Sequence, residues 1–321
     1  MWGDEIGDPH SHGWSGAYQV LSGTAIHARY TFRERARIDP KFAIGHLTLA
    51  SLGIQTPGAT ELVPAGSSCI HGQSYADRPG LSLSVRAAET AGLTLTYWEP
   101  GVALEASHVD DLTRRAIQGL DALYLADPGR CARALRRAVQ TNDFRRAFVV
   151  LRHAQRAYGQ QIDVGQIIEH AAPYLGTHGP SIVGALAHFK RLRSNAKNLE
   201  TLRTWNHRFL AGVLHFSPNR RVAERLIASR LPRADAGSFL ESQLLELAAT
   251  EAQPGHSLLG LPLHPDVAAV LALALRHRTY TAVLRHLAKE YDPADIKRKE
   301  RTVRRIYQGL RSHPLLAPAF A

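Results

Sequence analysis

Two histidines near the start of the chain, His10 and His12, are separated by a single residue in the stretch GDPHSHGWSGAYQVLSG. On a β-strand, residues i and i+2 point to the same face and lie about 6.5–7 Å apart, so both imidazoles can reach one metal ion. A chain with 17 His in 321 residues also produces a His-x-His pair by chance. The pair therefore predicts a metal centre only if a third ligand accompanies it.

A second stretch, GATELVPAGSSCIHG, supplies a candidate third ligand in His71. Gly58 is followed by five residues, by Pro64-x-Gly66 and then by His71. Glycines at such positions make the turns that bring two ligand strands together. Three imidazoles leave open positions on a metal ion. We therefore predict that His10, His12 and His71 hold a divalent first-row metal.

The two stretches resemble the two motifs of the cupin family, G(x)5HxH(x)3–4E(x)6G and G(x)5PxG(x)2H(x)3N. In the first motif the two histidines and Gly23 match, whereas Gly16 occupies the glutamate position and Asp4 the early glycine position. In the second motif, Gly58, Pro64 and Gly66 match. Four residues, rather than two, precede His71, and Tyr75 stands where the family has asparagine.

The loss of the glutamate narrows the resemblance to the three-histidine thiol dioxygenase branch, typified by cysteine dioxygenase. This likeness implies Fe(II), no organic cofactor, and dioxygen with a small polar substrate such as an amino acid or thiol. The family's Ser-x-His-x-Tyr strand corresponds to Ser82-x-Ser84-x-Arg86. We expect Arg86 or Arg29 to bind a substrate carboxylate bidentately, although salt bridges would explain both, and we take Tyr75 as a third catalytic candidate.

The first part of the chain is strand-like. Short runs such as TAIHARYTF and FAIGHLTLASLGI are rich in β-branched and aromatic residues and are separated by Gly, Pro and Asp. In TAIHARYTF the apolar residues alternate with His27 and Arg29, which share the other face. We interpret His27 and His46 as strand-face residues and Cys69 as a buried thiol. Residues 1–105 are predicted to form an antiparallel β-barrel of the cupin, or jelly-roll, type.

Residues 106–321 are predicted to form a basic, all-helical domain, so that the whole chain is of the α+β class. Apolar residues recur there at three- and four-residue spacing, with arginines opposite them. The Gly-rich segment 176–181 is interpreted as a helix break. The expected helices cover 112–125, 131–140, 143–158, 180–193, 199–215, 219–231, 238–250, 265–277, 279–290 and 293–312.

Charge divides the chain in the same place. Residues 1–111 carry 7 Lys and Arg against 12 Asp and Glu, whereas the remainder carries 32 against 16, which gives net charges of −5 and +16. A cupin followed by a basic helical domain is also the layout of AraC-type transcription regulators, so nucleic acid is an alternative partner. It is not favoured, because the helical part is about twice as long as two helix-turn-helix units require. A non-redox cupin isomerase or a binding module is the other alternative.

The composition indicates the class of protein and its expected cellular compartment. Hydrophobic residues make up 45% of the chain and charged residues 21%, as in ordinary globular proteins. The longest apolar run, 267–275, is far shorter than the roughly 18 residues that suggest a membrane span, so no membrane partner is expected. Two cysteines and an acidic, polar N-terminus favour the cytoplasm.

Overall fold

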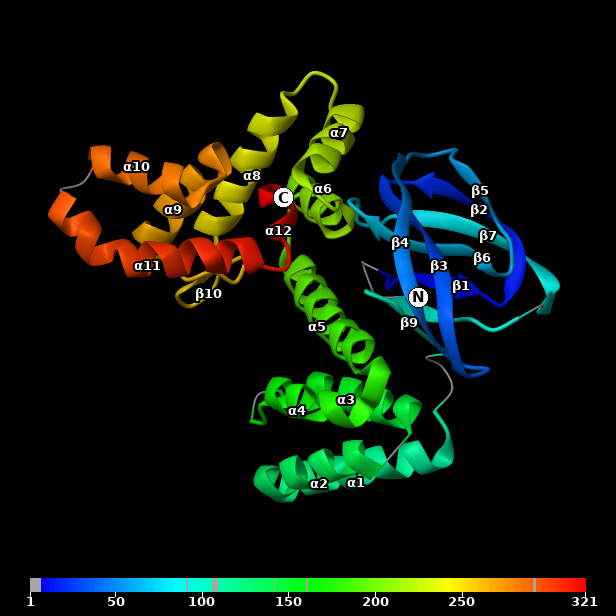
Figure 1. Cartoon of the computed structure of the whole chain (residues 1–321). Coiled ribbons are helices and arrows are strands. Elements are labelled where there is room, and N and C mark those ends of the chain that lie inside the picture. The colour runs from blue at the N-terminus through cyan, green and yellow to red at the C-terminus, as the bar shows by residue number, and fades with distance from the viewer. Residues whose placement is uncertain (1–6, 91, 106–108, 142, 160, 291–292) are drawn as a thin grey trace.

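The structure, a computed structural model, has a strand-rich N-terminal part followed by helices (Figure 1). It describes residues 7–90, 92–105, 109–141, 143–159, 161–290 and 293–321. The strands of the N-terminal part are β1 (His10–His12), β2 (Trp14–Ser22), β3 (Ala25–Asp39), β4 (Phe42–Gln55), β5 (Thr60–Val63), β6 (Gly66–Tyr75), β7 (Leu81–Thr90), β8 (Thr96–Trp98) and β9 (Val102–Leu104).

These strands form two antiparallel sheets. Six of them close into a barrel in the order β1-β6-β3-β4-β9-β8, and the other three form a sheet in the order β5-β2-β7. Tyr18 and Val20 of β2 pack with Val63 of β5 against Cys69 of β6, so the small sheet covers part of the barrel wall. The predicted antiparallel barrel is thus confirmed.

The alternating residues of TAIHARYTF lie on the two faces of strand β3, and each face has different neighbours. Ile26 and Ala28 are fully buried in a cluster that includes the apolar face of a helix. His27, on the opposite face, is also buried, with 6% of its surface exposed. The apolar face of β3 therefore packs against helices, while the polar face turns toward the side chains of β6 and β5.

The second part of the chain is built from helices. They are α1 (Asp111–Ala126), α2 (Pro128–Thr141), α3 (Phe144–Ala157), α4 (Val164–Ala171), the 3₁₀ helix η1 (Ala172–His178), α5 (Gly179–Thr201), α6 (Trp205–Phe216), α7 (Arg220–Arg230), α8 (Ala236–Ala249), α9 (Pro265–His277), α10 (Tyr280–Glu290), α11 (Pro293–Ser312) and α12 (Ala317–Phe320). Gly176 has φ +53°, which produces the expected break before α5.

Several details differ from the expectation, and two helices, α4 and the short α12, form outside the predicted helical ranges. The apolar spacing predicts separate helices over 180–193 and 199–215, whereas helix α5 runs without a break to Thr201. No Gly or Pro lies between residues 185 and 211 to end it earlier, and Thr204 caps α6. The helical part also contains a small hairpin, β10 (Glu251–Gln253) and β11 (His256–Ser257). Its turn uses Gly255 at φ +74°, a conformation that glycine adopts easily.

The barrel and the helices share their cores. Phe42 and Trp98 of the barrel pack with Phe148 of α3, whereas Ile26 of β3 lies against Gly212 of α6. The predicted boundary at residue 105 falls between β9 and α1, next to residues 106–108, which lie outside the described residues. Each group of helices therefore completes its hydrophobic core with a part of the barrel.

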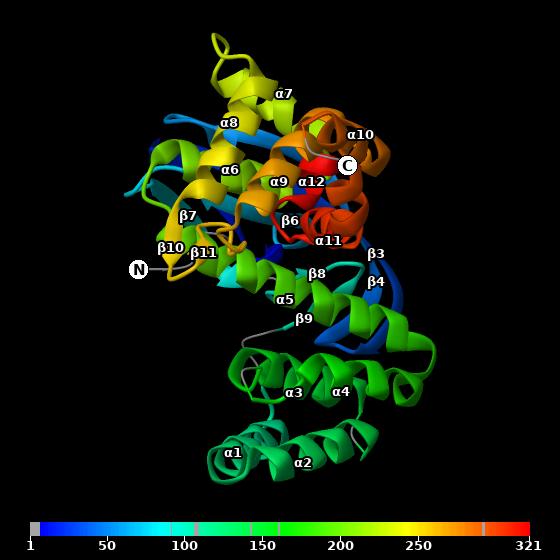
Figure 2. The same ribbon diagram turned by 90° about the vertical axis from the view of Figure 1, so that its left-hand side faces the viewer.

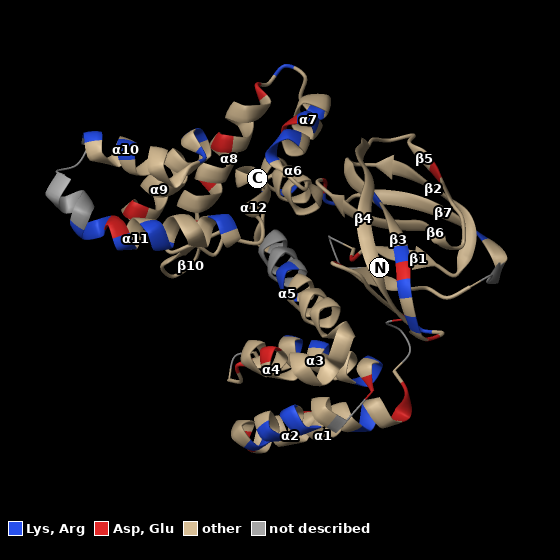
Figure 3. Cartoon of the chain, viewed as in Figure 1, with Lys and Arg blue, Asp and Glu red and all other residues tan. Residues whose placement is uncertain are grey.

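The helices form two groups on either side of α5. Figures 1 and 2 show α1–α4 stacked at one end, α6–α12 gathered at the other, and α5 between them. Lysines and arginines are distributed over many of these helices (Figure 3), and most arginines of the described helical residues are exposed. Among the described residues, we find no helix with the length and apolar character needed to cross a membrane.

Candidate metal centre

The three predicted histidines converge. Strand β1 pairs antiparallel with β6, with His10 directly opposite His71, and a register shift follows before His12. One nitrogen from each of the three rings can be chosen so that all three atoms lie within 4.8 Å of one another. The Nε2 atoms of His12 and His71 are 2.8 Å apart. The expected convergence of His10, His12 and His71 is therefore confirmed.

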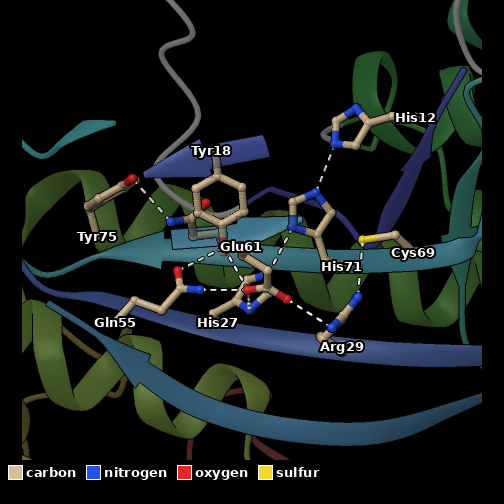
Figure 4. A network of polar contacts seen from close by, with 10 residues as sticks. His12, Tyr18, His27, Arg29, Gln55, Glu61, Cys69, His71 and Tyr75 are labelled. Atoms are coloured by element: carbon tan, nitrogen blue, oxygen red, sulfur yellow. Dashed lines mark hydrogen bonds and ion pairs between the residues drawn. The ribbon is translucent and has the colours of Figure 1, made fainter. Parts of the chain in front are cut away.

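A buried relay fixes the tautomer of His71 (Figure 4). The Glu61 carboxylate lies 3.2 Å from Nδ1 of His27, and Nε2 of His27 lies 2.9 Å from Nδ1 of His71. A carboxylate can only accept, so His27 donates from Nδ1 and, as a neutral ring, accepts at Nε2. His71 must then donate from Nδ1. Its Nε2 lone pair faces Nε2 of His12, from which it accepts a hydrogen bond at 2.8 Å in the metal-free site.

His10 is oriented by a backbone group. Its Nδ1 lies 2.9 Å from the carbonyl oxygen of Asp8, which can only accept a hydrogen bond. A neutral His10 therefore carries its proton on Nδ1 and its lone pair on Nε2. Two of the three rings thus have an acceptor behind Nδ1 and a lone pair in front, the arrangement that metal-ligating histidines usually show.

Glu61 is itself held by several donors. Nη1 of Arg29 lies 3.0 Å from Oε1, while Nε2 of Gln55 donates to Oε2 at 2.7 Å. The hydroxyl of Tyr18 is 2.8 Å from Oε1 of Gln55 and 3.2 Å from Oε2 of Glu61. Glu61 is 17% exposed, so its negative charge is neutralised mainly by Arg29 and by these hydrogen bonds. The carboxylate is consequently fixed in position behind His27.

Burial favours the neutral form of His71, His12 and His27. Loss of solvation lowers the pKa of His71 to about 2, and the nearby His10, His27, His12 and Arg29 charges add to the effect. Burial, followed by the charges of His10 and Arg86, lowers the pKa of His12 to about 4. The pKa of His27 is also lowered, chiefly by burial. Neutral imidazole is the form that binds metal, so the site is prepared for a cation near neutral pH.

The glutamate position of the first motif is closed by packing. A Cβ atom on Gly16 would lie 2.1 Å from the carbonyl oxygen of Val85 and 3.1 Å from the ring of Trp14. Strand β2 approaches β7 too closely there for any side chain. A glutamate side chain therefore cannot be accommodated at position 16 in this fold. Asp4, in the early glycine position, lies outside the described residues.

The other candidate residues lie around the cluster. Arg86 on β7 is exposed, and its guanidinium carbon lies 4.5 Å from the centre of the Trp14 ring, which is 4.4 Å from the His12 ring. Arg29 contacts Glu61 and lies 3.6 Å from Sγ of Cys69. Cys69 is buried as expected, and burial raises the pKa of its thiol. Arg86 is thus at the rim, whereas Arg29 lies behind the histidines.

Tyr75 lies further along β6. Its hydroxyl accepts a hydrogen bond from Nε2 of Gln73 at 3.1 Å. Tyr75 is four positions after His71, which corresponds to about 13 Å along a strand. The structure therefore places Tyr75 on the same face of β6 as His71 but toward the other end of the network in Figure 4.

Sequence reasoning missed the groups behind the ligands. The sequence pattern predicts His27 to be an ordinary strand-face residue and does not single out Glu61, Gln55 or Tyr18. A signal for His27 was available, because alternation along β3 puts it opposite the buried Ile26 and Ala28. Glu61 and Tyr18 reach the network only through the packing of β5 and β2 on the barrel, which no local pattern reveals.

The donor set fits a metal ion. Nitrogen donors about 2.1 Å from one ion lie about 3.0–3.4 Å apart, a spacing within the range that the cluster spans. Comparisons with protein-family models, with curated proteins and with solved structures find no match to this chain. The geometry itself therefore supports the conclusion, a barrel with a three-histidine cluster that could bind a metal ion, compatible with a cupin-like centre.

Proposed function

We propose that the chain is a non-haem Fe(II)-dependent enzyme that carries out an oxygenase-type reaction on a small polar substrate, such as an amino acid or a thiol. The observation that carries this proposal is the His10–His12–His71 cluster, with acceptors behind two of its rings and no room for a carboxylate at Gly16. Three neutral ligands leave a divalent ion its full charge, which favours an anionic substrate group beside it.

Fe(II) bound by three imidazoles would supply open coordination positions for the substrate and dioxygen. The chain's own contribution is to orient the donors and to exclude water from the groups behind them. Glu61 and His27 hold His71 in one tautomer, and the Asp8 carbonyl does the same for His10. A donor set that is fixed before binding loses less freedom when the substrate enters.

Arg86 is the residue we assign to the substrate carboxylate. It stands at the rim beside Trp14, it is exposed, and its charge contributes to the lowered pKa of His12. Arg29 is the weaker candidate, because Glu61 already accepts from its guanidinium. A guanidinium fork matches a carboxylate geometrically, so Arg86 would set the orientation of a substrate whose other end faces the histidines.

Both cysteines are free and buried, which supports the assignment to the reducing cytoplasm.

Oxygen uptake by the Fe(II)-loaded protein tests this function. We expect uptake with one member of a panel of amino acids and small thiols. His71→Ala should lose both metal and turnover, whereas Arg86→Gln should keep the metal and show a raised KM or a lowered kcat. Full turnover by metal-free His71→Ala protein would overturn the proposal. Bound metal without oxygen uptake across the panel would favour the isomerase or binding-module alternative.

A further inference from the structure

A separate cleft lies between helix α5 and the β3–β4 pair. Its volume is about 1150 Å³. One wall is the edge formed by Arg33 of β3 and His46 of β4, which are directly opposite each other in the ladder. The facing wall is α5, where His188 and Arg191 are one turn apart. Basic residues occur on both of these elements in Figure 3. We call this space the α5 cleft; it contains none of the metal-centre residues.

The walls of the α5 cleft are held closely together at its base. Gly184 of α5 packs on Pro100, between β8 and β9, and a Cβ on Gly184 would lie 2.6 Å from the Pro100 ring. Glu99 precedes this proline and lies 3.4 Å from Nδ1 of His188 and 3.6 Å from Nη2 of Arg191. Glu99 therefore anchors the two basic residues of α5, and its hydrogen bond to His188 and the charge of Arg191 help to lower its pKa.

The cleft has more basic groups than its one carboxylate can neutralise. Arg33 and His46 are both exposed, and among the residues that the structure describes neither has an ion-pair partner. His188 is only 8% exposed. Its Nε2 atom is buried and has no hydrogen-bond partner in the same set of residues. A buried imidazole nitrogen without a partner is costly. On the opposite wall, the guanidinium of Arg33 lacks an anionic acceptor within the described part of the chain.

The geometry points to the α5 cleft as a binding site for a phosphorylated small molecule, held between Arg33 and His46 on one side and Arg191 on the other. A planar carboxylate is satisfied by a single guanidinium fork. Donors from two facing walls suit a tetrahedral phosphate with three free oxygens, and the cleft is larger than one phosphate requires. Glu99 stands where it can accept from a hydroxyl or amino group on the remainder of the ligand. This site is independent of the proposed oxygenase reaction.

Isothermal titration of the full-length protein with pyrophosphate tests the site, with inorganic phosphate and acetate as comparison ligands. We expect binding of pyrophosphate, weaker binding of phosphate and none of acetate. Arg33→Gln and Arg191→Gln should each weaken pyrophosphate binding by about tenfold or more, because each removes a charge-assisted hydrogen bond. Arg35→Gln, which removes the same charge from an exposed residue of β3 that does not line the cleft, should change it less than about twofold.

Several outcomes would overturn the inference. These are no pyrophosphate binding at low salt, equal losses in Arg33→Gln and Arg35→Gln, or acetate binding as strong as that of phosphate. Arg33 has no partner in the described fold, so Arg33→Gln keeps the test valid even if Arg191→Gln disturbs the contact with Glu99. A short DNA duplex serves as a further arm. Duplex binding that depends on Arg33 while pyrophosphate fails to bind would assign the cleft to nucleic acid instead.

Discussion

The metal centre and the α5 cleft are built from the same kinds of side chain, histidine, arginine and glutamate, in opposite arrangements. In the candidate metal centre, Glu61 accepts from Arg29 and His27, and the groups left facing the site are imidazole nitrogens. In the cleft, Glu99 faces His188 and Arg191, and the groups left over include the guanidinium of Arg33. Which members of such a cluster remain without a partner therefore decides whether it is suited to a cation or to an anion.

Removal of one of the three histidines should have the largest effect on metal binding. His71→Ala deletes the histidine that both β1 ligands face, and two remaining imidazoles bind a first-row ion far more weakly than three. We expect the variant to retain less than about a tenth of the bound metal after dialysis, measured by elemental analysis. His170→Ala, an exposed histidine on α4, is the matched control and should keep its metal. Equal metal contents in the two variants would contradict the assignment.

The carboxylate behind the ligands should matter less than a ligand but still measurably. Glu61→Gln removes the negative charge and replaces one of the two acceptor oxygens that face His27 and Arg29 with a donor, so His71 is held less firmly in one tautomer. Metal affinity should fall by about 10- to 100-fold in a competition titration against a chelator. Glu34→Gln, at an exposed glutamate that pairs with Arg37, should leave the affinity unchanged. If Glu61→Gln binds metal as tightly as wild type, the relay has no part in positioning.

Acid should destabilise the metal-free protein through the same histidines. The pKa of His71 is lowered from 6.5 to about 2 in the folded state, so unfolding at pH 5 takes up a proton that the folded protein does not bind. Stability therefore falls as the pH drops from 7 to 5, by about 2 kcal/mol from this residue alone. Denaturant unfolding of wild type and His71→Ala at both pH values measures it. The loss between pH 7 and pH 5 should be smaller in the variant; identical losses would show that His71 is not kept neutral by folding.

The smallest effect on metal affinity is expected from a substitution in the α5 cleft, because the cleft and the metal centre share no residue. Arg33→Gln alters the α5 cleft but none of the groups that hold His10, His12 and His71. Its metal affinity should stay within about twofold of the wild-type value in the chelator titration. A tenfold change would mean that the cleft and the metal centre act on each other, and the comparison between two independent sites would fail.

The sequence predicted most of the strands and helices and the three clustered histidines, because these depend on local patterns. Alternation in β3, apolar spacing in the helices and the His-x-His and Pro-x-Gly motifs are readable over a few residues. His27 and Glu61 escaped notice because they meet His71 only when β3 and β5 are placed around β6. The α5 cleft depends on a contact even farther apart in the sequence, between a strand pair and Gly184–Arg191. Such pairings follow from tertiary packing, which a single sequence does not display.

X-ray absorption spectroscopy of the Fe(II)-loaded protein tests the central claim most directly, because it counts the ligands and measures their distances. One ion per chain should show about three imidazole nitrogens at 2.0–2.2 Å, with the remaining positions taken by light atoms that change when substrate is added. His71→Ala should not yield this spectrum. A spectrum with one imidazole or none, or one that is the same in wild type and His71→Ala, would contradict a metal centre formed by His10, His12 and His71.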